Sequence, residues 1–359
     1  MKKRIPSLFL ALIMVLNLVA CGAKPETAAP QTEASATNVF IDDAGREVML
    51  PDQISRIVPA GPLAQMILFA IAPDLLVGLS TQWYDSAEGI IPQEYLDLPY
   101  FGQLYGSADM NIEGLALADP QLIIDMGQTM DSVAEDLDTL QEQTTIPTVF
   151  ISTSLKTMPQ TYRTLGKLLG REEKAEVLAQ FCERVYTRTV SIMDLVGDNK
   201  VDALYVLGEE GLNVLAKDSY HAELMDMLTN NLAVVENPMS KGTGNSVSME
   251  QIALWNPDFV VFGPGSIYNT VETMDGWGEM DAIVRGAYVE VPDVPHNWMS
   301  MPPAVQRYLG LIWLTAQLYP EYCEYDVQAE IMEYYELFYG CTLTQQQYAT
   351  ITANAIREG

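Results

Sequence analysis

The two histidines, His221 and His296, are the first residues to consider for chemistry, because the chain has no others. A neutral imidazole can ligate a metal centre, although a solitary histidine more often only hydrogen-bonds to its neighbours. Sites for bare zinc or manganese need several histidines and carboxylates that converge on one point. No such spacing occurs here. The sequence therefore predicts neither a bare-metal site nor a resident cofactor.

Motifs of the common enzyme classes are also absent. There is no GxSxG elbow, no GxxxxGK[ST] phosphate loop, no HExxH and no complete GxGxxG. The paired glycines in Gly242-Thr-Gly244 and Gly263-Pro-Gly265 are better explained as turns. Because the sequence shows no motif for an activated nucleophile, we predict that the protein is not an enzyme.

An internal repeat, whose two copies we call the echo segments, is the most informative pattern. The segment NIEGLALADPQLII at 111–124 is matched by SMEQIALWNPDFVV at 248–261. Each copy predicts an N-cap residue, a glutamate two residues later (Glu113 and Glu250), a short helix that ends at Asp-Pro or Asn-Pro, and a buried strand. A first-turn glutamate favours a helix N-terminus, and for one copy that explanation would suffice. Two copies imply one helix and strand unit in each half of the chain.

Short β-branched runs alternate with amphipathic stretches, a pattern typical of α/β folds. Strands are predicted at 54–58, 75–79, 121–125 and 148–151, and again at 203–207, 232–235, 258–262 and 288–291. Between the two sets, 172–196 predicts one uninterrupted helix of about 37 Å, long enough to join two lobes. We expect a first lobe at 39–155, a linking helical segment at 156–198 and a second lobe at 199–359.

Composition agrees with a folded protein of two lobes. The chain has 359 residues, of which 48% are hydrophobic, and single cores stop growing near ~250 to 300 residues. With 48 acidic residues against 19 Lys plus Arg, the formal charge is -29. Most of the surface would repel a polyanion, so nucleic acid is excluded as a partner.

The N-terminus predicts export. Lys2, Lys3 and Arg4 precede an apolar run at 8–20, which indicates a signal peptide over 1–20. The run ends in LVACG, similar to a bacterial lipobox, so we predict that Cys21 carries lipid. Residues 21–38 then form the lipidated cysteine and a polar tether of about 20 to 25 Å. We expect a monomer anchored by lipid on the extracytoplasmic face of the cell membrane.

The sequence resembles the substrate-binding proteins of ABC importers for iron-siderophore, haem and cobalamin. The resemblance rests on ISRIVPAGPLAQMILF at 54–69, LLVGLS at 75–80, both echo segments and NWMSMPPAVQRYLGLIW at 297–313, and it covers about 40–345. It implies two α/β lobes joined by a single long helix, with a ligand cleft between the lobes. It also implies that Glu113 and Glu250 dock to the two subunits of an ABC permease, which works with a cytoplasmic ATPase.

Ligand residues in such a fold come from loops that face the gap between the lobes. Aromatic side chains there would suit a large planar chelate. The ligand-binding residues that we predict are Trp83, Tyr84, Tyr105, Lys241, Tyr268, His296 and Trp298. Residues 61–63, Glu209 and Glu210 are further candidates. Arg307 either meets an anionic ligand or pairs with an acid in its own helical stretch.

The function predicted is capture of a metal chelate, with ferric siderophore favoured, and its delivery to the permease. Haem, cobalamin and a molybdate-like oxyanion are alternative ligands. A lipid-anchored adhesin or scaffold without transport is the alternative from another class. The remaining cysteines are Cys182, Cys323 and Cys341. A helix between the last two would hold them about 20 Å apart, beyond the ~7 Å reach of a disulfide, so no bridge is expected.

Overall fold

The structure is a computed structural model that describes residues 38–105, 110–239 and 242–356. The predicted signal peptide, Cys21, nearly all of the predicted tether and Lys241 lie outside the described residues. Among the helices that are described, none is long and apolar enough to cross a membrane. Residues from Asn38 onward form one compact unit, which contains two main sheets.

The first lobe is built on a parallel sheet in the order β3 (Ile57–Pro59), β4 (Leu122–Gly127) and β5 (Thr148–Ser152). The first five residues of β4 are buried, as expected for a parallel strand covered on both faces. The hairpin β1 (Val39–Ile41) and β2 (Glu47–Met49) precedes this sheet. The helices of this lobe are α1 (Pro62–Ile71), α2 (Gln93–Leu96), α3 (Ile112–Ala118) and α4 (Val133–Thr144).

The second lobe has a mixed sheet in the order β11 (Tyr288–Glu290), β10 (Phe259–Phe262), β6 (Asp202–Leu207), β7 (Asn213–Val214) and β9 (Asn245–Ser246). The strand β8 (Asn230–Asn231) also pairs with β6. The central pair β6 and β10 is parallel and almost wholly buried, whereas β7 runs antiparallel to β6. The helices here are α7 (Glu223–Leu228), α8 (Met249–Trp255) and α9 (Asp281–Val284).

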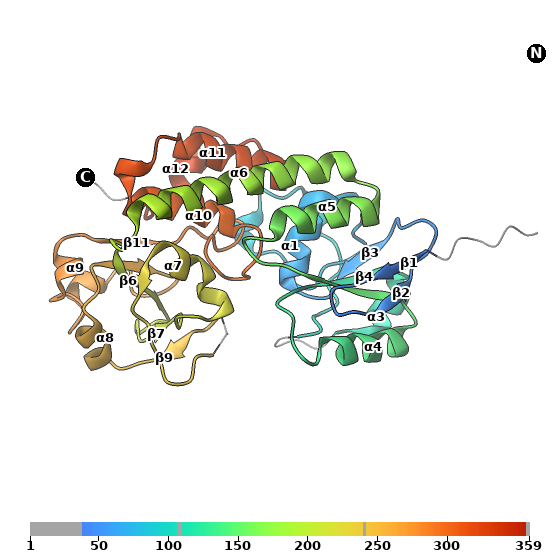
Figure 1. The fold of residues 1–359 in the computed structure, drawn as a ribbon, viewed down its shortest axis with the longest axis horizontal. Coiled ribbons are helices and arrows are strands. Elements are labelled where there is room, and N and C mark those ends of the chain that lie inside the picture. The colour runs from blue at the N-terminus through green and yellow to red at the C-terminus, as the bar shows by residue number, and fades with distance from the viewer. Residues whose placement is uncertain (1–37, 106–109, 240–241, 357–359) are drawn as a thin grey trace, which may run out of the picture. The chain divides into compact units, whose positions relative to one another are not determined.

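The predicted linking helix is confirmed as α6 (Glu172–Val196), which passes over both lobes in Figure 1. It packs against α5 (Met158–Leu169) and α10 (Arg307–Leu318). After α10 the chain continues with α11 (Val327–Tyr334), a π-helical turn (Tyr335–Tyr339) and α12 (Gln345–Ile351). Arg184 of α6 bonds Glu333 of α11 at 2.7 Å, and Arg188 pairs with Glu330. These ion pairs hold α6, the helix that joins the lobes, against α11.

Two predicted strands are wrong. Residues 75–79 make only isolated bridges, Ile57 to Leu76 and Leu79 to Tyr100, because a short 3-10 turn at Pro73–Leu75 takes the chain out of the sheet. Residues 232–235 have no strand either, and Val234 is 67% exposed there. The pairing that was expected for 232–235 is made just upstream, by the two residues of β8.

The cysteines within the described residues are free thiols: Cys182 is buried, and Cys323 and Cys341 are half-buried. The helix predicted between the last two is present as α11 and its π-helical continuation.

Candidate functional site

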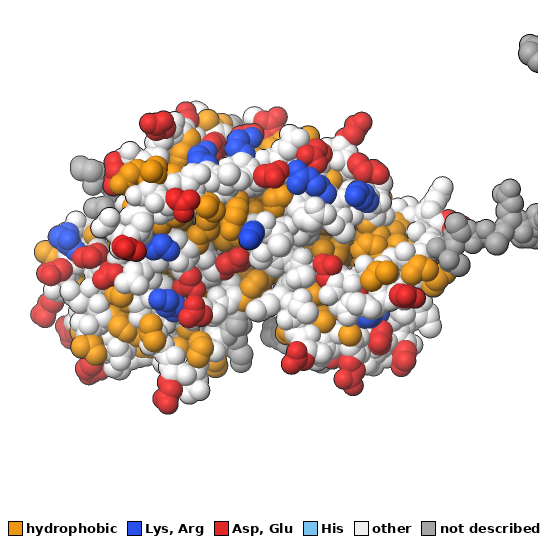
Figure 2. Space-filling view, viewed as in Figure 1, with side chains coloured by type: hydrophobic (Ala, Val, Ile, Leu, Met, Phe, Trp, Pro, Cys, Tyr) orange, Lys and Arg blue, Asp and Glu red, His pale blue; other side chains and the backbone are white. Residues whose placement is uncertain are grey.

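A cleft of about 650 Å³ is lined by residues of both lobes. In the first lobe it meets the loop from β3 into α1 and the residues at the end of β4. In the second lobe it meets the segments around residues 220, 243 and 302. The carboxyl ends of β3, β4 and β5 share one sheet edge, which is where α/β proteins bind ligands. Figure 2 shows the surface indented between the lobes, on the side away from α6.

Asp125 is the acidic group of the cleft wall in the first lobe. It is 5% exposed and lies near the end of β4. Burial raises the pKa of its carboxyl to about 7, and a backbone N–H at Met126 opposes this only in part. Nearby, the Tyr105 hydroxyl donates to Asp136 at 2.8 Å, and burial raises the pKa of Tyr105. Asp125 is therefore about half protonated at neutral pH.

Both histidines line the cleft from the second lobe. Nδ1 of His221 lies 2.9 Å from the Ser300 carbonyl oxygen, and burial lowers the pKa of this ring. His296 is 3% exposed, and burial lowers its pKa to about 4. Neither ring nitrogen of His296 has a hydrogen-bond partner, which costs on the order of 1 to 3 kcal/mol for each buried group. Aromatic rings surround it: Trp83 at 5.3 Å and Tyr84 at 4.9 Å between centroids.

Several of the predicted ligand residues come together here. Tyr84, Tyr105 and His296 line the cleft, and so do Gly61, Pro62 and Leu63. Trp83 does not line it but lies behind His296, where it packs edge-on against Phe69. Lys241 lies outside the described residues, next to Gly242 of the cleft wall. Their roles in ligand binding remain predictions.

Two of the predicted residues, Trp298 and Tyr268, do not line the cleft. Trp298 is fully buried, 6.3 Å from the Trp313 ring of α10, because the loop that carries His296 folds inward after it. Tyr268 belongs to a cluster with Phe262 and Tyr288 in the second lobe. The further candidates Glu209 and Glu210 are exposed and do not line the cleft.

Sequence reasoning missed other residues of the cleft wall. The main ones are Asp125, Met126, Gln128, Phe150, Tyr220, His221 and Met301. Asp125 to Gln128 could have been found, because they end a predicted strand at the sheet edge where ligands bind. Of the second-lobe residues, Tyr220 and His221 lie in a short 3-10 helix just before α7, and Met301 lies in a loop, so no periodic pattern marks them.

The junction of the lobes is formed by second-lobe side chains that hold the chain between β5 and α5. Tyr220 donates to the Thr153 carbonyl at 3.0 Å, and Tyr308 donates to the Leu155 carbonyl at 2.6 Å. The Leu155 N–H donates to Glu223 at 3.2 Å. Arg307 pairs with this same Glu223 and does not line the cleft. Of the two roles expected for Arg307, pairing with an acid is the one observed, although the acid lies in α7 and not in the helical stretch of Arg307.

The echo segments fold alike, position for position. In α3 the Asn111 side chain accepts the Gly114 N–H, and in α8 the Ser248 side chain accepts the Gln251 N–H. Both helices end at a left-handed residue, Asp119 in α3 (φ 49°) or Asn256 in α8 (φ 45°). Burial repeats as well, with one buried residue in each helix. Figure 1 labels α3 and α8 on the side of the molecule away from α6.

Each twin helix presents a glutamate and a leucine to solvent. Glu113 and Glu250 are exposed, and hydrogen bonds at the helix start lower the pKa of Glu250. One turn later stand Leu117, 88% exposed, and Leu254, 78% exposed. Leucine at such exposure is ordinary as a single case but not as a repeated one. The repeated helix therefore exposes the same two residue types in each lobe.

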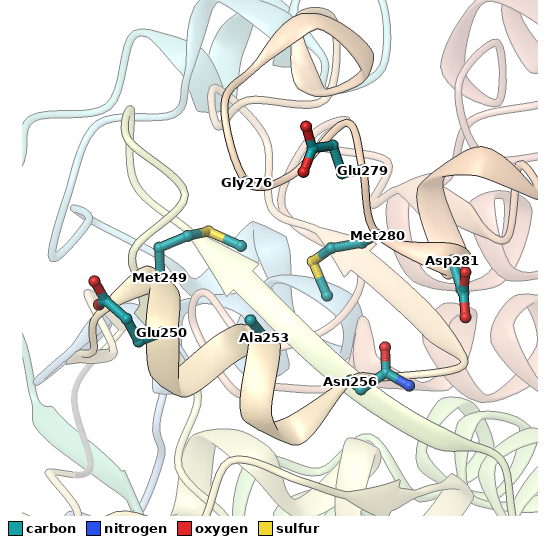
Figure 3. A pocket seen from close by; sticks show the side chains of 8 residues that line it. All are labelled: Met249, Glu250, Ala253, Asn256, Gly276, Glu279, Met280 and Asp281. Carbon is teal, nitrogen blue, oxygen red and sulfur yellow. The ribbon is translucent and has the colours of Figure 1, made fainter.

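A shallow pocket adjoins Glu250 on α8 (Figure 3). The side chains of Met249 and Met280 extend into it, and the carboxylates of Glu250, Glu279 and Asp281 stand around it. Gly276 has φ +82°, and a Cβ there would lie 2.7 Å from Met249, so close packing requires glycine. The surface beside Glu250 is thus apolar at its centre and acidic at its rim.

Comparison with known proteins gives consistent matches. The model of a family described as periplasmic binding protein matches residues 99–294, which are 196 of the 359 residues. The uncharacterized ABC transporter substrate-binding lipoprotein YvrC of Bacillus subtilis is 23% identical over 331 residues, 89% of this chain and 99% of YvrC.

Solved structures share the fold. An ABC transporter solute-binding protein from Sulfurospirillum deleyianum has a TM-score of 0.81 at 24% identity, over 88% of this chain and 99% of its own. The molybdate-binding protein MolA of Haemophilus influenzae has a TM-score of 0.67 at 18% identity, over 85% of this chain and 99% of its own.

Proposed function

The chain belongs to the periplasmic binding protein family, and from this premise we propose that it is the lipid-anchored substrate-binding component of an ABC importer. It captures a metal chelate, with ferric siderophore favoured, and delivers it to a permease driven by a cytoplasmic ATPase. The observation that carries the proposal is the cleft lined by both lobes together with the twin exposed helices. The lipoprotein relative supports anchoring through Cys21.

The composition of the cleft wall favours a chelate over an oxyanion. No lysine or arginine side chain is among the described residues that line it, and Arg307, which does not line it, is paired with Glu223. A molybdate-like anion, as bound by MolA, would need strong cationic or N–H donors. Phe150, Met126, Met301 and the tyrosines offer instead the apolar and aromatic area that suits a chelate.

Docking uses the two faces defined by Glu113 with Leu117 and by Glu250 with Leu254, which we name the twin docking faces. The occupant is a permease built from two equivalent subunits, each with a basic residue beside an apolar contact. Charge complementarity supports this choice, because both glutamates are exposed and unpaired among the described ion pairs. Repetition of the face on both lobes calls for a partner that is itself twofold.

Charge reversal tests the proposal. Host cells that carry Glu113→Arg, Glu250→Arg or both are supplied with radioactive iron in their own concentrated culture supernatant, and uptake is measured. The double variant should lose most uptake, while the purified variant still binds labelled iron from the same supernatant. Glu173→Arg, on the exposed first turn of α6, is the matched control. Uptake that survives both reversals would refute docking and leave an adhesin or scaffold as the better account.

A further inference from the structure

The chain has only two histidines, and both of them line the same cleft. We infer that the cleft takes a chelate whose metal keeps exchangeable coordination positions, and that His221 and His296 fill those positions. This inference rests on the proposed function and narrows its ligand class. A chelator that occupies every position of the metal would leave nothing for the two imidazoles to bind.

His221 is already oriented as a ligand. A carbonyl oxygen can only accept, so the contact between Nδ1 and the Ser300 carbonyl at 2.9 Å places the proton on Nδ1. The lone pair is then on Nε2, which no described hydrogen bond uses. A carbonyl that holds the second nitrogen in this way is the usual partner of a metal-bound histidine, because it fixes both the tautomer and the ring orientation.

His296 is a buried imidazole whose two ring nitrogens form no hydrogen bond in the described structure. Both nitrogens lack partners, and the side chain is 97% shielded, being 3% exposed. In this structure the nitrogens are covered, so binding requires the ring to turn toward the cleft. Tyr84 lies edge-on to the ring and is 53% exposed, which makes it the side chain that can move aside. A bond to metal would supply the missing partner.

A bare metal ion does not fit this site. Across residues 38–105, 110–239 and 242–356, no group of three or more His, Cys, Asp or Glu side chains could hold one. Two imidazoles leave at least two positions unfilled on Cu²⁺, Ni²⁺, Zn²⁺ or iron, which take four or more ligands. The cleft has room for a small chelator that provides the rest, and its apolar wall at Met126, Phe150 and Met301 would pack against the carbon frame of that chelator. Imidazole ligands favour Cu²⁺, Ni²⁺, Zn²⁺ or iron as the cargo.

Copper iminodiacetate is a direct probe, because it is neutral, leaves positions open and gives an electron paramagnetic resonance spectrum that reports bound nitrogen. Residues 38–359 form one compact unit and are freed of metal before titration. We expect one complex per protein with nitrogen couplings from two imidazoles. His221→Gln and His296→Gln should each weaken binding at least tenfold and remove one coupling. Copper ethylenediaminetetraacetate, which has no open position, should show no such coupling.

The controls separate the inference from a loss of folding and from the proposed function. Asp194→Asn changes an exposed residue of α6 that does not line the cleft and should bind as the parent does. His296→Asn replaces the Gln variant if thermal unfolding shows that the latter is destabilised. Copper binding that is unchanged in the double histidine variant, or a parent spectrum without imidazole nitrogen, overturns the inference. Either result leaves the uptake test of the glutamate reversals unaffected, so the two failures are distinguishable.

Discussion

The guanidinium of Arg307 lies 2.7 Å from the carboxylate of Glu223, with the arginine side chain fully buried and the glutamate side chain 30% exposed. The same carboxylate accepts the N–H of Leu155, where the chain passes from β5 to α5. This ion pair therefore links α10 and α7 of the second lobe to the loop between β5 and α5, where the chain leaves the first lobe.

Arg307→Met should destabilise the protein by about 3 kcal/mol, the low end of the range for breaking a buried pair, because Glu223 keeps some contact with water. Urea unfolding measures the loss. Arg285→Met is the matched control, since its bond to Asp258 is exposed on both sides and is worth under ~1 kcal/mol. Equal effects in the two variants would show that the junction pair does not stabilise the fold.

Asp125→Asn should change how stability depends on pH. The native carboxyl has its pKa raised to about 7 by burial, whereas an unfolded aspartate titrates near ~3.9. The stability that the protonated Asp125 carboxyl provides is thus fully present below pH ~4 and is lost as pH rises toward about 7. Over this window the free energy of unfolding falls on the order of 1 kcal/mol per pH unit. Unfolding free energies of parent and variant should diverge with pH over this window. Parallel curves would show that Asp125 ionises normally.

Leu117→Ser and Leu254→Ser should weaken docking without touching the ligand. Each change removes an exposed apolar side chain from a twin docking face, and burying a leucine at an interface is worth roughly 1.5 to 3 kcal/mol. Binding of the protein to vesicles that contain its permease should fall about tenfold for each variant. Leu195→Ser, a leucine 68% exposed on α6, is the control. If that control weakens binding as much, the twin docking faces are wrongly placed.

The elements that the sequence predicted best are those with a long, uninterrupted pattern. The bounds of α6 were predicted correctly because its apolar stripe runs without Pro or Gly until Gly197. The echo identified α3 and α8 because caps, stop signals and burial all repeat. Residues 75–79 look like a strand, yet after the 3-10 turn at Pro73–Leu75 they make only isolated bridges, Ile57 to Leu76 and Leu79 to Tyr100. Whether such a run joins a sheet depends on long-range partners, which local pattern does not reveal.

The cleft was harder to predict for a similar reason. His296 and Trp298 are two residues apart in one loop, but the first lines the cleft and the second enters the core. Asn297 between them accepts the N–H groups of Met299 and Ser300, and this turns the chain inward. In a loop without periodicity, composition shows that aromatic and polar residues gather there but not which way each one faces.

The most direct test of the account is the content of the cleft in the protein isolated from its own host. After incubation with concentrated culture supernatant, the purified protein should carry about one metal per chain. Its absorbance spectrum should show a chelate: a broad charge-transfer band for a siderophore, a Soret band for haem or a corrin spectrum for cobalamin. A protein that stays colourless and metal-free through this treatment would contradict chelate capture.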